Sequence, residues 1–327
     1  MPSEKTKFLQ MPKVSVIIAV YNVEQYIERC LHTLFSQTFD DIEYIFVNDG
    51  STDRSSTIIT EVLKQYPHRI SHVKILRHEY NKGIAAARTT GILAATGEYI
   101  IHCDPDDYLE TDMYELMYNT VKKTGADIVV CDHIYEKNGQ LYTTHTQLET
   151  SPAECLRYWY TKNTDYSSLC DKLVRRLLII QNNIIPYAGI DSGEDFGCMV
   201  RIFYHARSIV HVPKALYHYV RRSSSVSMQT MNRKAFDSSL RLAQEICTFL
   251  KDKGYDDFCN NMKFDIKLSG RHLFYDKESE WFNIFPECHK HVLSYKGNSL
   301  KSRLLWWMAL RNVVVYKLLK AYIPALR

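Results

Sequence analysis

Short apolar runs alternate with amphipathic stretches along the first part of the chain. The first run, Val14–Val20, is rich in β-branched residues, and helical spacing follows it from Glu24 to Gln37. The second run, Ile42–Asn48, precedes a turn and another helical stretch from Arg54 to Gln65. A nearly continuous apolar run of this length is typical of a parallel strand buried on both faces. The pattern therefore predicts consecutive βα units, and hence a parallel sheet with crossover helices.

The alternation of strand-like and helix-like segments continues to about residue 220. Further strands are expected at 73–76, 98–103 and 128–132, further helices at 84–95 and 111–123, and a hairpin turn at 136–139. Beyond Ser227 the strand-like runs end, and two long amphipathic stretches, 234–251 and 256–275, predict helices. We therefore expect an N-terminal tail at residues 1–12, an α/β domain at 13–227 and a helical region at 228–327.

Composition is that of a folded globular protein. The 327 residues are 46% hydrophobic and 24% charged, which is close to the average for soluble domains. The nine cysteines are scattered singly without a CxxC pair, a pattern that argues against a disulfide framework or structural zinc and favours a reducing compartment. Residues 1–13 show no apolar segment of the signal-peptide type. The chain also has no Walker-type loop and no GxGxxG after the first strand, so neither a P-loop nor a dinucleotide site is expected.

Positive charge is concentrated at the C-terminal end. Residues 288–327 carry eight Lys and Arg and no Asp or Glu, although the net charge of the chain is only +4. The apolar run Leu304–Leu310 and the residues after it are interrupted by Arg311, Lys317 and Lys320, so we expect no membrane span. A basic helix that carries Trp favours in-plane contact with an anionic membrane surface. The alternatives are packing on the rest of the chain or on a second copy in a homodimer. Nucleic acid is not an expected partner, because no nucleic-acid-binding module is present.

Carboxylates that follow predicted strands carry the candidate chemistry. Asp104, Asp106 and Asp107 come directly after the strand at 98–103, at the edge where open α/β sheets bind ligands. Three neighbouring carboxylates repel one another unless a cation or a solvated turn relieves them, and oxygen ligands suit Mg²⁺ or Mn²⁺. The alternative is an Asp-Pro turn that caps the next helix. Asp49 ends the second strand in the same way, either as a ligand-binding carboxylate or as part of an Asp-Gly turn.

A second acidic pair, Glu194 and Asp195, begins a predicted helix at 196–205. The helix dipole keeps carboxylates in the first turn ionised, so the pair either stabilises the helix or supplies a general base for a hydroxyl nucleophile. Farther along, Arg221 and Arg222 follow a short predicted strand and precede a serine-rich loop. Guanidinium groups bind phosphate oxygens through paired hydrogen bonds, so this loop either binds a diphosphate or is a solvated basic loop.

Together these motifs resemble the inverting glycosyltransferases of family 2. The resemblance rests on five segments in the expected order, at 14–22, 46–53, 81–88, 104–107 and 193–195. It implies a GT-A fold, which is a Rossmann-like, mostly parallel α/β sheet flanked by helices, here with a C-terminal helical extension. The chain departs from the family pattern at Ala19, where proline is usual, at Thr90, where asparagine is usual, and at 169–172, where the usual Trp-Asn-Lys reads Leu-Cys-Asp-Lys.

The resemblance implies a role for each matched position on the donor side. Tyr21 and Asp49 would line a nucleobase pocket, with Asp49 accepting a hydrogen bond from the uracil ring nitrogen. Lys82, Gly83 and Arg88 would border the nucleotide.

The remaining matched positions concern the metal, the diphosphate and the acceptor. In the family's DxD motif, Asp104 would face the ribose or the metal shell, and Asp106 would ligate Mn²⁺ or Mg²⁺ at the diphosphate. Arg222 and His218 would lie near the diphosphate and the metal. On the acceptor side, Asp195 matches the catalytic base and Glu194 stands beside it. Asp171 would be either a substrate contact or a turn residue.

These roles imply a single in-line displacement that inverts the anomeric carbon. The expected reaction moves a hexosyl or N-acetylhexosaminyl group from a UDP-sugar to a hydroxyl of a glycan or lipid-linked acceptor. Its expected place is the cytoplasm or the cytoplasmic face of the inner membrane, in bacterial surface-polysaccharide synthesis. The alternative is a non-catalytic nucleotide- or carbohydrate-binding protein on the same fold, which the 23 tyrosines favour. A nucleotidyltransferase of this fold would carry a Gly-rich basic loop where the chain has Tyr21–Glu24.

Overall fold

The computed structural model describes residues 11–160, 166–222, 230–275, 277–293, 295 and 299–322, so most of the predicted N-terminal tail lies outside the described residues. The chain divides into two compact units. The sheet unit contains the residues before 147 together with 168–189 and 205–222, and the helical unit contains 147–167, 190–204 and the residues from 223 onward. Each unit is described by itself below.

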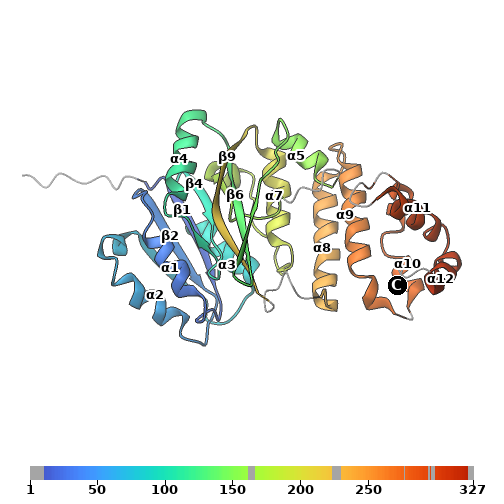
Figure 1. Cartoon of the computed structure of the whole chain (residues 1–327), viewed down its shortest axis with the longest axis horizontal. Coiled ribbons are helices and arrows are strands. Elements are labelled where there is room, and N and C mark those ends of the chain that lie inside the picture. Colours follow the sequence, from blue (N-terminus) through green and yellow to red (C-terminus); the bar gives the residue numbers. More distant parts are fainter. Residues whose placement is uncertain are drawn as a thin grey trace, which may run out of the picture. The chain divides into compact units, whose positions relative to one another are not determined.

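Among the described residues, the sheet unit contains nine strands, with β7 paired to β6 and the others in the order β3-β2-β1-β4-β8-β6-β9-β5. Figure 1 labels β1, β2, β4, β6 and β9 of this sheet. Strands β3, β2, β1 and β4 are parallel to one another, and β6 is parallel to β9. Strands β5, β7 and β8 join antiparallel. The strands are β1 Val14–Val20, β2 Ile42–Asn48, β3 Val73–Arg77, β4 Tyr99–His102, β5 Tyr108–Leu109, β6 Ile128–Lys137, β7 Gln140–Thr144, β8 Lys172–Arg175 and β9 Ile209–Arg221.

Helices complete both units and confirm the predicted α/β fold with a helical extension. The sheet unit contains α1 Ile27–Phe35, α2 Ser55–Leu63, α3 Ile84–Ala94, α4 Met113–Thr124 and α6 Arg176–Gln181. The helices of the second unit are α5 Pro152–Tyr158, α7 Glu194–His205, whose last residue belongs to the sheet unit, α8 Arg233–Leu250, α9 Asp256–Ser269, α10 Glu278–Phe282, α11 Leu300–Ala309 and α12 Val313–Tyr322. The elements predicted from the hydrophobic pattern are present, and most of their ends differ by a few residues. Strand β9 is longer than the short strand expected there, and α9 ends at Ser269 rather than at 275.

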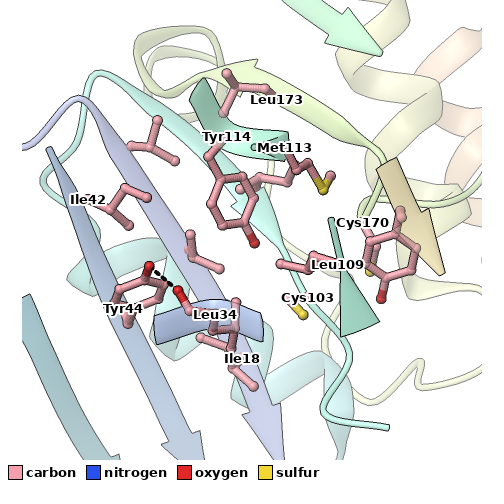
Figure 2. Close-up of a cluster of buried hydrophobic side chains, with 14 of the residues drawn as sticks. Ile18, Leu34, Ile42, Tyr44, Cys103, Leu109, Met113, Tyr114, Cys170 and Leu173 are labelled. Carbon is pink, nitrogen blue, oxygen red and sulfur yellow. Dashed lines mark hydrogen bonds between the residues drawn. The ribbon is translucent and has the colours of Figure 1, made fainter. Parts of the chain in front are cut away.

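A continuous apolar core holds α1 and α4 against the sheet. Every residue of β2 is buried, as a strand covered on both faces requires. Figure 2 shows part of this core, in which the Tyr44 hydroxyl donates a hydrogen bond to the Leu34 carbonyl at 2.5 Å. Met113 and Tyr114, in the first turn of α4, belong to the same cluster. Burial of one such large side chain stabilises the fold by about 1.5–3 kcal/mol.

The strand order places a topological switch point between β1 and β4. The chain adds β2 and then β3 on one side of β1, and next crosses to add β4 on the other side. In open α/β sheets, ligands bind outside the carboxyl ends of the strands at such a point. Tyr21, Asp49 and Asp104 follow the carboxyl ends of β1, β2 and β4 within two residues. The fold therefore brings three predicted site residues to one edge of the sheet.

The helical unit is built around a pair of long helices, α8 and α9, which lie side by side (Figure 1). The Asn232 side chain caps α8 by accepting from the backbone N–H of Ala235. Aromatic residues dominate the core of this unit, including Phe236, Phe264 and Trp281. Among the described residues, the structure contains no helix with the length and apolar character needed to cross a membrane.

Candidate functional site

The loop between β3 and α3, residues 78–83, is held by hydrogen bonds to the side chain of Asp49. The Asp49 side chain is buried, and its Oδ1 accepts from the backbone N–H of Lys82 at 2.9 Å. Its Oδ2 accepts from the backbone N–H of Gly83, also at 2.9 Å. The Nδ1 atom of His78 lies 2.6 Å from Oδ1. Both carboxylate oxygens thus hold the loop, and the contact of Asp49 with a uracil base stays a prediction.

Gly50 lets the same loop pack directly on the turn after β2. Its φ is +71°, a left-handed conformation that side chains disfavour. A Cβ atom at this position would stand 2.6 Å from the carbonyl carbon of Tyr80 and 2.7 Å from the backbone nitrogen of Asn81. The loop is therefore held by hydrogen bonds to Asp49 and by backbone contact at Gly50.

Thr90, at which the chain departs from the family pattern, contacts a residue of this loop. Thr90 lies on α3, and its Oγ1 is 2.9 Å from Nε2 of His78. His78 therefore connects the Asp49 carboxylate to the Thr90 hydroxyl. His78 was not predicted as a site residue, although it follows β3 directly, and the argument applied to Asp49 and Asp104 would have singled it out.

Two arginines contact the acidic turn after β4. Nη2 of Arg88 donates to Oδ1 of Asp104 at 2.9 Å, and Arg88 itself is buried on α3. Nη1 of Arg222 donates to Oδ2 of Asp106 at 2.9 Å. The side chains of Asp104 and Asp106 keep 31% and 35% of their surface exposed. The structure thus brings Arg88 and Arg222, predicted for the nucleotide and the diphosphate, to the acidic motif itself.

Asp107 has a different environment from the other two acids of the motif. Its side chain is buried, Oδ1 accepts from the backbone N–H of Val220, and Oδ2 accepts from the Tyr217 hydroxyl at 2.7 Å. Burial, reinforced by the charge of Asp106, raises the pKa of Asp107 well above its usual range. These contacts fasten the acidic turn to β9. Asp107 is therefore a structural anchor, and Asp104 and Asp106 are the acids left partly exposed.

The exposed pair fits a divalent cation by the chemistry of its donors. Burial and the neighbouring Asp104 charge raise the pKa of Asp106, and a cation would relieve that repulsion. Carboxylate oxygens are the ligands that Mg²⁺ and Mn²⁺ prefer, and Mg²⁺ in phosphate-transfer sites commonly takes one or two carboxylates with substrate phosphates and water. No group of three or more His, Cys, Asp or Glu side chains in the described ranges could by itself hold a metal ion. A metal here would depend on oxygens of a bound diphosphate.

His218 lies against Tyr108 and Glu110. Its ring is stacked on that of Tyr108 with centroids 4.0 Å apart, and its Nε2 is 2.7 Å from Oε1 of Glu110. Its Nδ1 atom is buried and has no hydrogen-bond partner among the residues that the structure describes. The expected role of His218 near a metal stays a prediction.

The predicted acceptor-side residues lie in both units. In the sheet unit, Asp171 is buried and accepts from the Lys172 ammonium at 2.7 Å, and Lys172 also donates to the Ser168 carbonyl. In the helical unit, Glu194 and Asp195 form the first turn of α7. Oδ1 of Asp195 accepts from the backbone N–H of Phe196 at 2.7 Å. Asp195 thus occupies a helix N-terminus, where the dipole favours the ionised carboxylate.

Two further predicted residues present exposed side chains. Tyr21, directly after β1, keeps 46% of its surface exposed. The Lys82 ammonium lies 5.4 Å from the centroid of the Tyr80 ring, and Tyr80 is 63% exposed. An aromatic ring and an ammonium group are therefore available to solvent at the carboxyl edge of the sheet.

Comparison with known proteins identifies several relatives. The family model described as Glycosyl transferase family 2 matches residues 15–178. EpsH of Bacillus subtilis (strain 168), whose name describes it as a glycosyltransferase, is 33% identical over 250 residues, which are 75% of this chain and 71% of that protein. The fold is similar to that of S. aureus TarS 1-349 in complex with UDP-GlcNAc, with a TM-score of 0.70, 21% identity and coverage of 94% of this chain and 92% of that one. It is also similar to mannosyltransferase PcManGT from Pyrobaculum calidifontis in complex with GDP-Man and Mn²⁺, with a TM-score of 0.50, 16% identity and coverage of 97% and 86%.

Proposed function

We propose, from the premise that this chain belongs to glycosyl transferase family 2 and is a glycosyltransferase, that it transfers a hexose or N-acetylhexosamine from a UDP-sugar with inversion. The acceptor is a hydroxyl of a glycan or lipid-linked saccharide in bacterial surface-polysaccharide synthesis. One observation carries the proposal: Asp49, Asp104 and Asp106 follow β2 and β4 at the switch-point edge of the sheet. The UDP-GlcNAc complex of TarS supports a nucleotide-sugar donor.

The donor binds along this edge of the sheet unit. Tyr21, Lys82 and Gly83 border the uridine, together with Asp49 and Arg88. Arg222 binds the diphosphate, because a guanidinium offers two parallel N–H donors to phosphate oxygens. In the structure those donors contact Asp106, and this contact with the acidic motif supports a role of Arg222 in diphosphate binding.

Asp104 and Asp106 would hold Mn²⁺ or Mg²⁺, and His218 would be the residue near that cation. Such a cation, when bound, neutralises charge on the diphosphate leaving group. The Mn²⁺ in the PcManGT complex supports this assignment. The contribution of the chain is to keep two carboxylates partly exposed on a turn that Asp107 anchors to β9.

Asp195 is the general base that removes the proton from the acceptor hydroxyl. Its place in the first turn of α7 favours the ionised form, which a base requires. Glu194 and Asp171 support the acceptor side. A single displacement by the activated hydroxyl breaks the bond between the anomeric carbon and UDP, and it therefore inverts that carbon.

The test measures binding and transfer separately. Thermal unfolding is followed with UDP, GDP, CDP and dTDP, each with Mn²⁺ and with EDTA, since a ligand at 100 times its Kd adds about 2.7 kcal/mol of stability. Stabilisation by UDP only with metal is expected. Transfer from UDP-sugars is then assayed for the wild type and Asp195→Asn, and the variant is expected to lose transfer while keeping UDP affinity.

Asp256→Asn is the matched control, because Asp256 is a first-turn carboxylate of α9 in the same unit. It is expected to transfer at the wild-type rate. Transfer by Asp195→Asn at that rate would refute the assignment of the base. UDP binding without transfer from any UDP-sugar would favour the alternative of a non-catalytic nucleotide- or carbohydrate-binding protein.

We also propose that the end of the helical unit contacts an anionic membrane, which places the enzyme at the cytoplasmic face of the inner membrane. Helix α11 buries Trp306 in the core of the unit, whereas Leu300, Leu304 and Met308, spaced four residues apart, are at least 45% exposed. The exposed residues of α12 include Val314 and Leu318, next to the exposed Lys317. Tyr316 of α12 enters the same core as Trp306, so both helices direct apolar side chains away from it. Apolar residues exposed on helices whose own charged residues are all basic fit an anionic lipid surface, and Lys320 of α12 is paired with Glu278 of α10.

Cosedimentation with vesicles tests this contact. The protein is expected to bind vesicles that contain phosphatidylglycerol and to bind phosphatidylcholine vesicles weakly. Leu304→Glu combined with Leu318→Glu should abolish binding, whereas Leu141→Glu, at an exposed leucine of β7, should not. A homodimer in solution that only the double variant dissociates would instead assign these faces to a second copy of the chain.

A further inference from the structure

His78, the first residue of the loop at residues 78–83, makes several contacts that hold the loop in place. The backbone N–H of His78 donates to the Asn48 carbonyl at the end of β2, at 2.8 Å. Its ring contacts Asp49 through Nδ1 and Thr90 through Nε2, at 2.6 and 2.9 Å. The residue is 8% exposed. His78 therefore links the end of β2, the loop and α3 at one point.

The two ring nitrogens of His78 have different roles in hydrogen bonding. A carboxylate only accepts hydrogen bonds, so Nδ1 carries the hydrogen that points at Asp49. In the neutral ring Nε2 is then an acceptor, and the Thr90 hydroxyl donates to it. The same Oδ1 that His78 contacts also accepts from the Lys82 N–H. The ring thus fixes the carboxylate in the orientation that receives the loop backbone.

The loop presents its polar groups at the edge where the donor binds. It follows β3 at its carboxyl end, beside the turn after β2, and Tyr80 and Lys82 are exposed on it. Ordering a free loop on ligand binding costs conformational entropy, and a preformed loop avoids that cost. We propose that His78 is a positioning residue for the donor nucleotide, because it orients Asp49 and keeps the loop at residues 78–83 formed before the nucleotide binds.

This inference rests on the proposed function, since it assigns the loop to a nucleoside diphosphate. It also gives Asp49 a further role, because its carboxylate supports the loop backbone whether or not it contacts the base. Substitution of Asp49 would disturb both, so His78 is the residue at which loop positioning can be tested separately.

Two substitutions of His78 separate its two contacts. Asparagine places an amide N–H near the position of Nδ1, so His78→Asn keeps a donor for Asp49 and loses the contact with Thr90. Glutamine reaches the position of Nε2, so His78→Gln keeps a partner for Thr90 and loses the donor to Asp49. His72→Asn is the control, because the Nδ1 atom of His72 lies 2.8 Å from the Ile42 carbonyl at the opposite end of β2.

The experiment measures the Kd of UDP with Mn²⁺ by calorimetry, together with the unfolding temperature of each variant. His78→Gln is expected to weaken UDP binding about tenfold or more, as the loss of a hydrogen bond to a charged group implies. His78→Asn should restore the affinity to within about threefold of the wild type. His72→Asn should bind UDP as the wild type does. A merely structural role would lower the unfolding temperatures of His78→Asn and His78→Gln alike and would not produce this difference in affinity.

Amide hydrogen exchange without nucleotide provides the second readout. The amides of Lys82 and Gly83 are expected to exchange faster in His78→Gln than in the wild type or His78→Asn, because their acceptor is no longer oriented. Equal exchange in all three proteins would overturn the inference, and so would an affinity of His78→Gln for UDP equal to that of the wild type. Either result would leave the proposed function standing as long as the wild type binds UDP. Failure of the wild type to bind UDP would overturn the proposed function and the assignment of the loop to a nucleotide.

Discussion

The guanidinium of Arg222 donates to Asp106 at two points, to the carboxylate Oδ2 at 2.9 Å and to the backbone carbonyl at 2.7 Å. The contact joins the end of β9 to a turn 116 positions earlier in the chain. It places a positive charge on an acid whose pKa is raised by burial and by Asp104. A diphosphate would offer the same guanidinium a second anionic partner at the same turn.

Removal of this guanidinium should weaken binding of the diphosphate more than binding of the nucleoside. We expect Arg222→Ala to raise the Kd of UDP about tenfold and that of uridine less than about twofold, since a charge-assisted hydrogen bond contributes about 1.5–3 kcal/mol. Calorimetric titration with both ligands measures the difference. Arg221→Ala is the control, because the Arg221 guanidinium lies over the Tyr135 ring, 4.2 Å from its centroid. Equal losses for UDP and uridine would contradict the role of Arg222.

A methyl group at Gly50 should lower the free energy of unfolding more than the left-handed backbone conformation of this residue alone predicts. Gly50→Ala adds a Cβ atom 2.6 Å from the Tyr80 carbonyl carbon, at a residue with φ +71°. Gly139 has a similar φ of +74°, but a Cβ there would meet nothing within 4 Å. We expect Gly139→Ala to lower the free energy of unfolding by about 1 kcal/mol and Gly50→Ala by about 3 kcal/mol. Urea denaturation measures both, and similar losses would show that the close packing at Gly50 is unimportant.

Asp107 should behave as a buried acid whose pKa is raised. Asp107→Ala removes the partner of the Val220 N–H and the Tyr217 hydroxyl, with an expected loss of about 2 kcal/mol in the free energy of unfolding. Asp107→Asn keeps an acceptor for Val220 and should lose about half as much.

The contribution of Asp107 to the free energy of unfolding should depend on pH, because burial raises the pKa of this residue. Between the usual carboxyl pKa and the raised one, the folded protein binds a proton that the unfolded chain does not, so acidification favours the folded state. The free energy of unfolding of the wild type, measured relative to Asp107→Asn, should therefore rise as the pH falls from 7 toward 4. A difference that falls instead would mean that Asp107 is held ionised.

The parallel half of the sheet could be predicted from the sequence because its strands correspond to short apolar runs that are visible in the sequence. Val14–Val20 and Ile42–Asn48 are continuous apolar runs, and each became a strand with those bounds. Strand β9 was expected only as a short strand, yet it extends from Ile209 to Arg221. Pro213 lies within it, and proline usually indicates the end of a strand or an edge position. The antiparallel β8, four residues long, is determined by its neighbours β4 and β6 rather than by its own pattern.

The candidate site was predictable where it depends on strand ends and unpredictable where it depends on packing. Asp49 and Asp104 could be placed because they follow apolar strands. The pairing of Arg88 with Asp104 requires the packing of α3, and the pairing of Arg222 with Asp106 requires the return of β9. No spacing along the chain encodes either contact.

A buried contact in the helical unit links its stability to pH. The Lys267 ammonium is fully buried and donates to the carbonyls of Phe282 and Ile284, at 2.7 and 2.6 Å. It also lies 2.7 Å from Nε2 of His289. Because an ammonium only donates, the His289 ring must accept through Nε2 and must therefore be neutral. Burial, together with the Lys267 charge, lowers the pKa of His289 to about 4.

Acidification should therefore destabilise this unit between pH 6.5 and 4. In that window the unfolded histidine takes up a proton that the folded one does not, so the unfolded state binds more protons and the free energy of unfolding falls as the pH falls. His289→Gln keeps an acceptor for Lys267 but does not titrate. We expect the wild type to lose about 1 kcal/mol relative to this variant across the window, a value reduced for the partial exposure of the ring. Urea denaturation of both proteins at several pH values measures the difference. A difference that does not change with pH would mean that His289 titrates alike in the folded and unfolded states, and that its contact with Lys267 is not formed in solution.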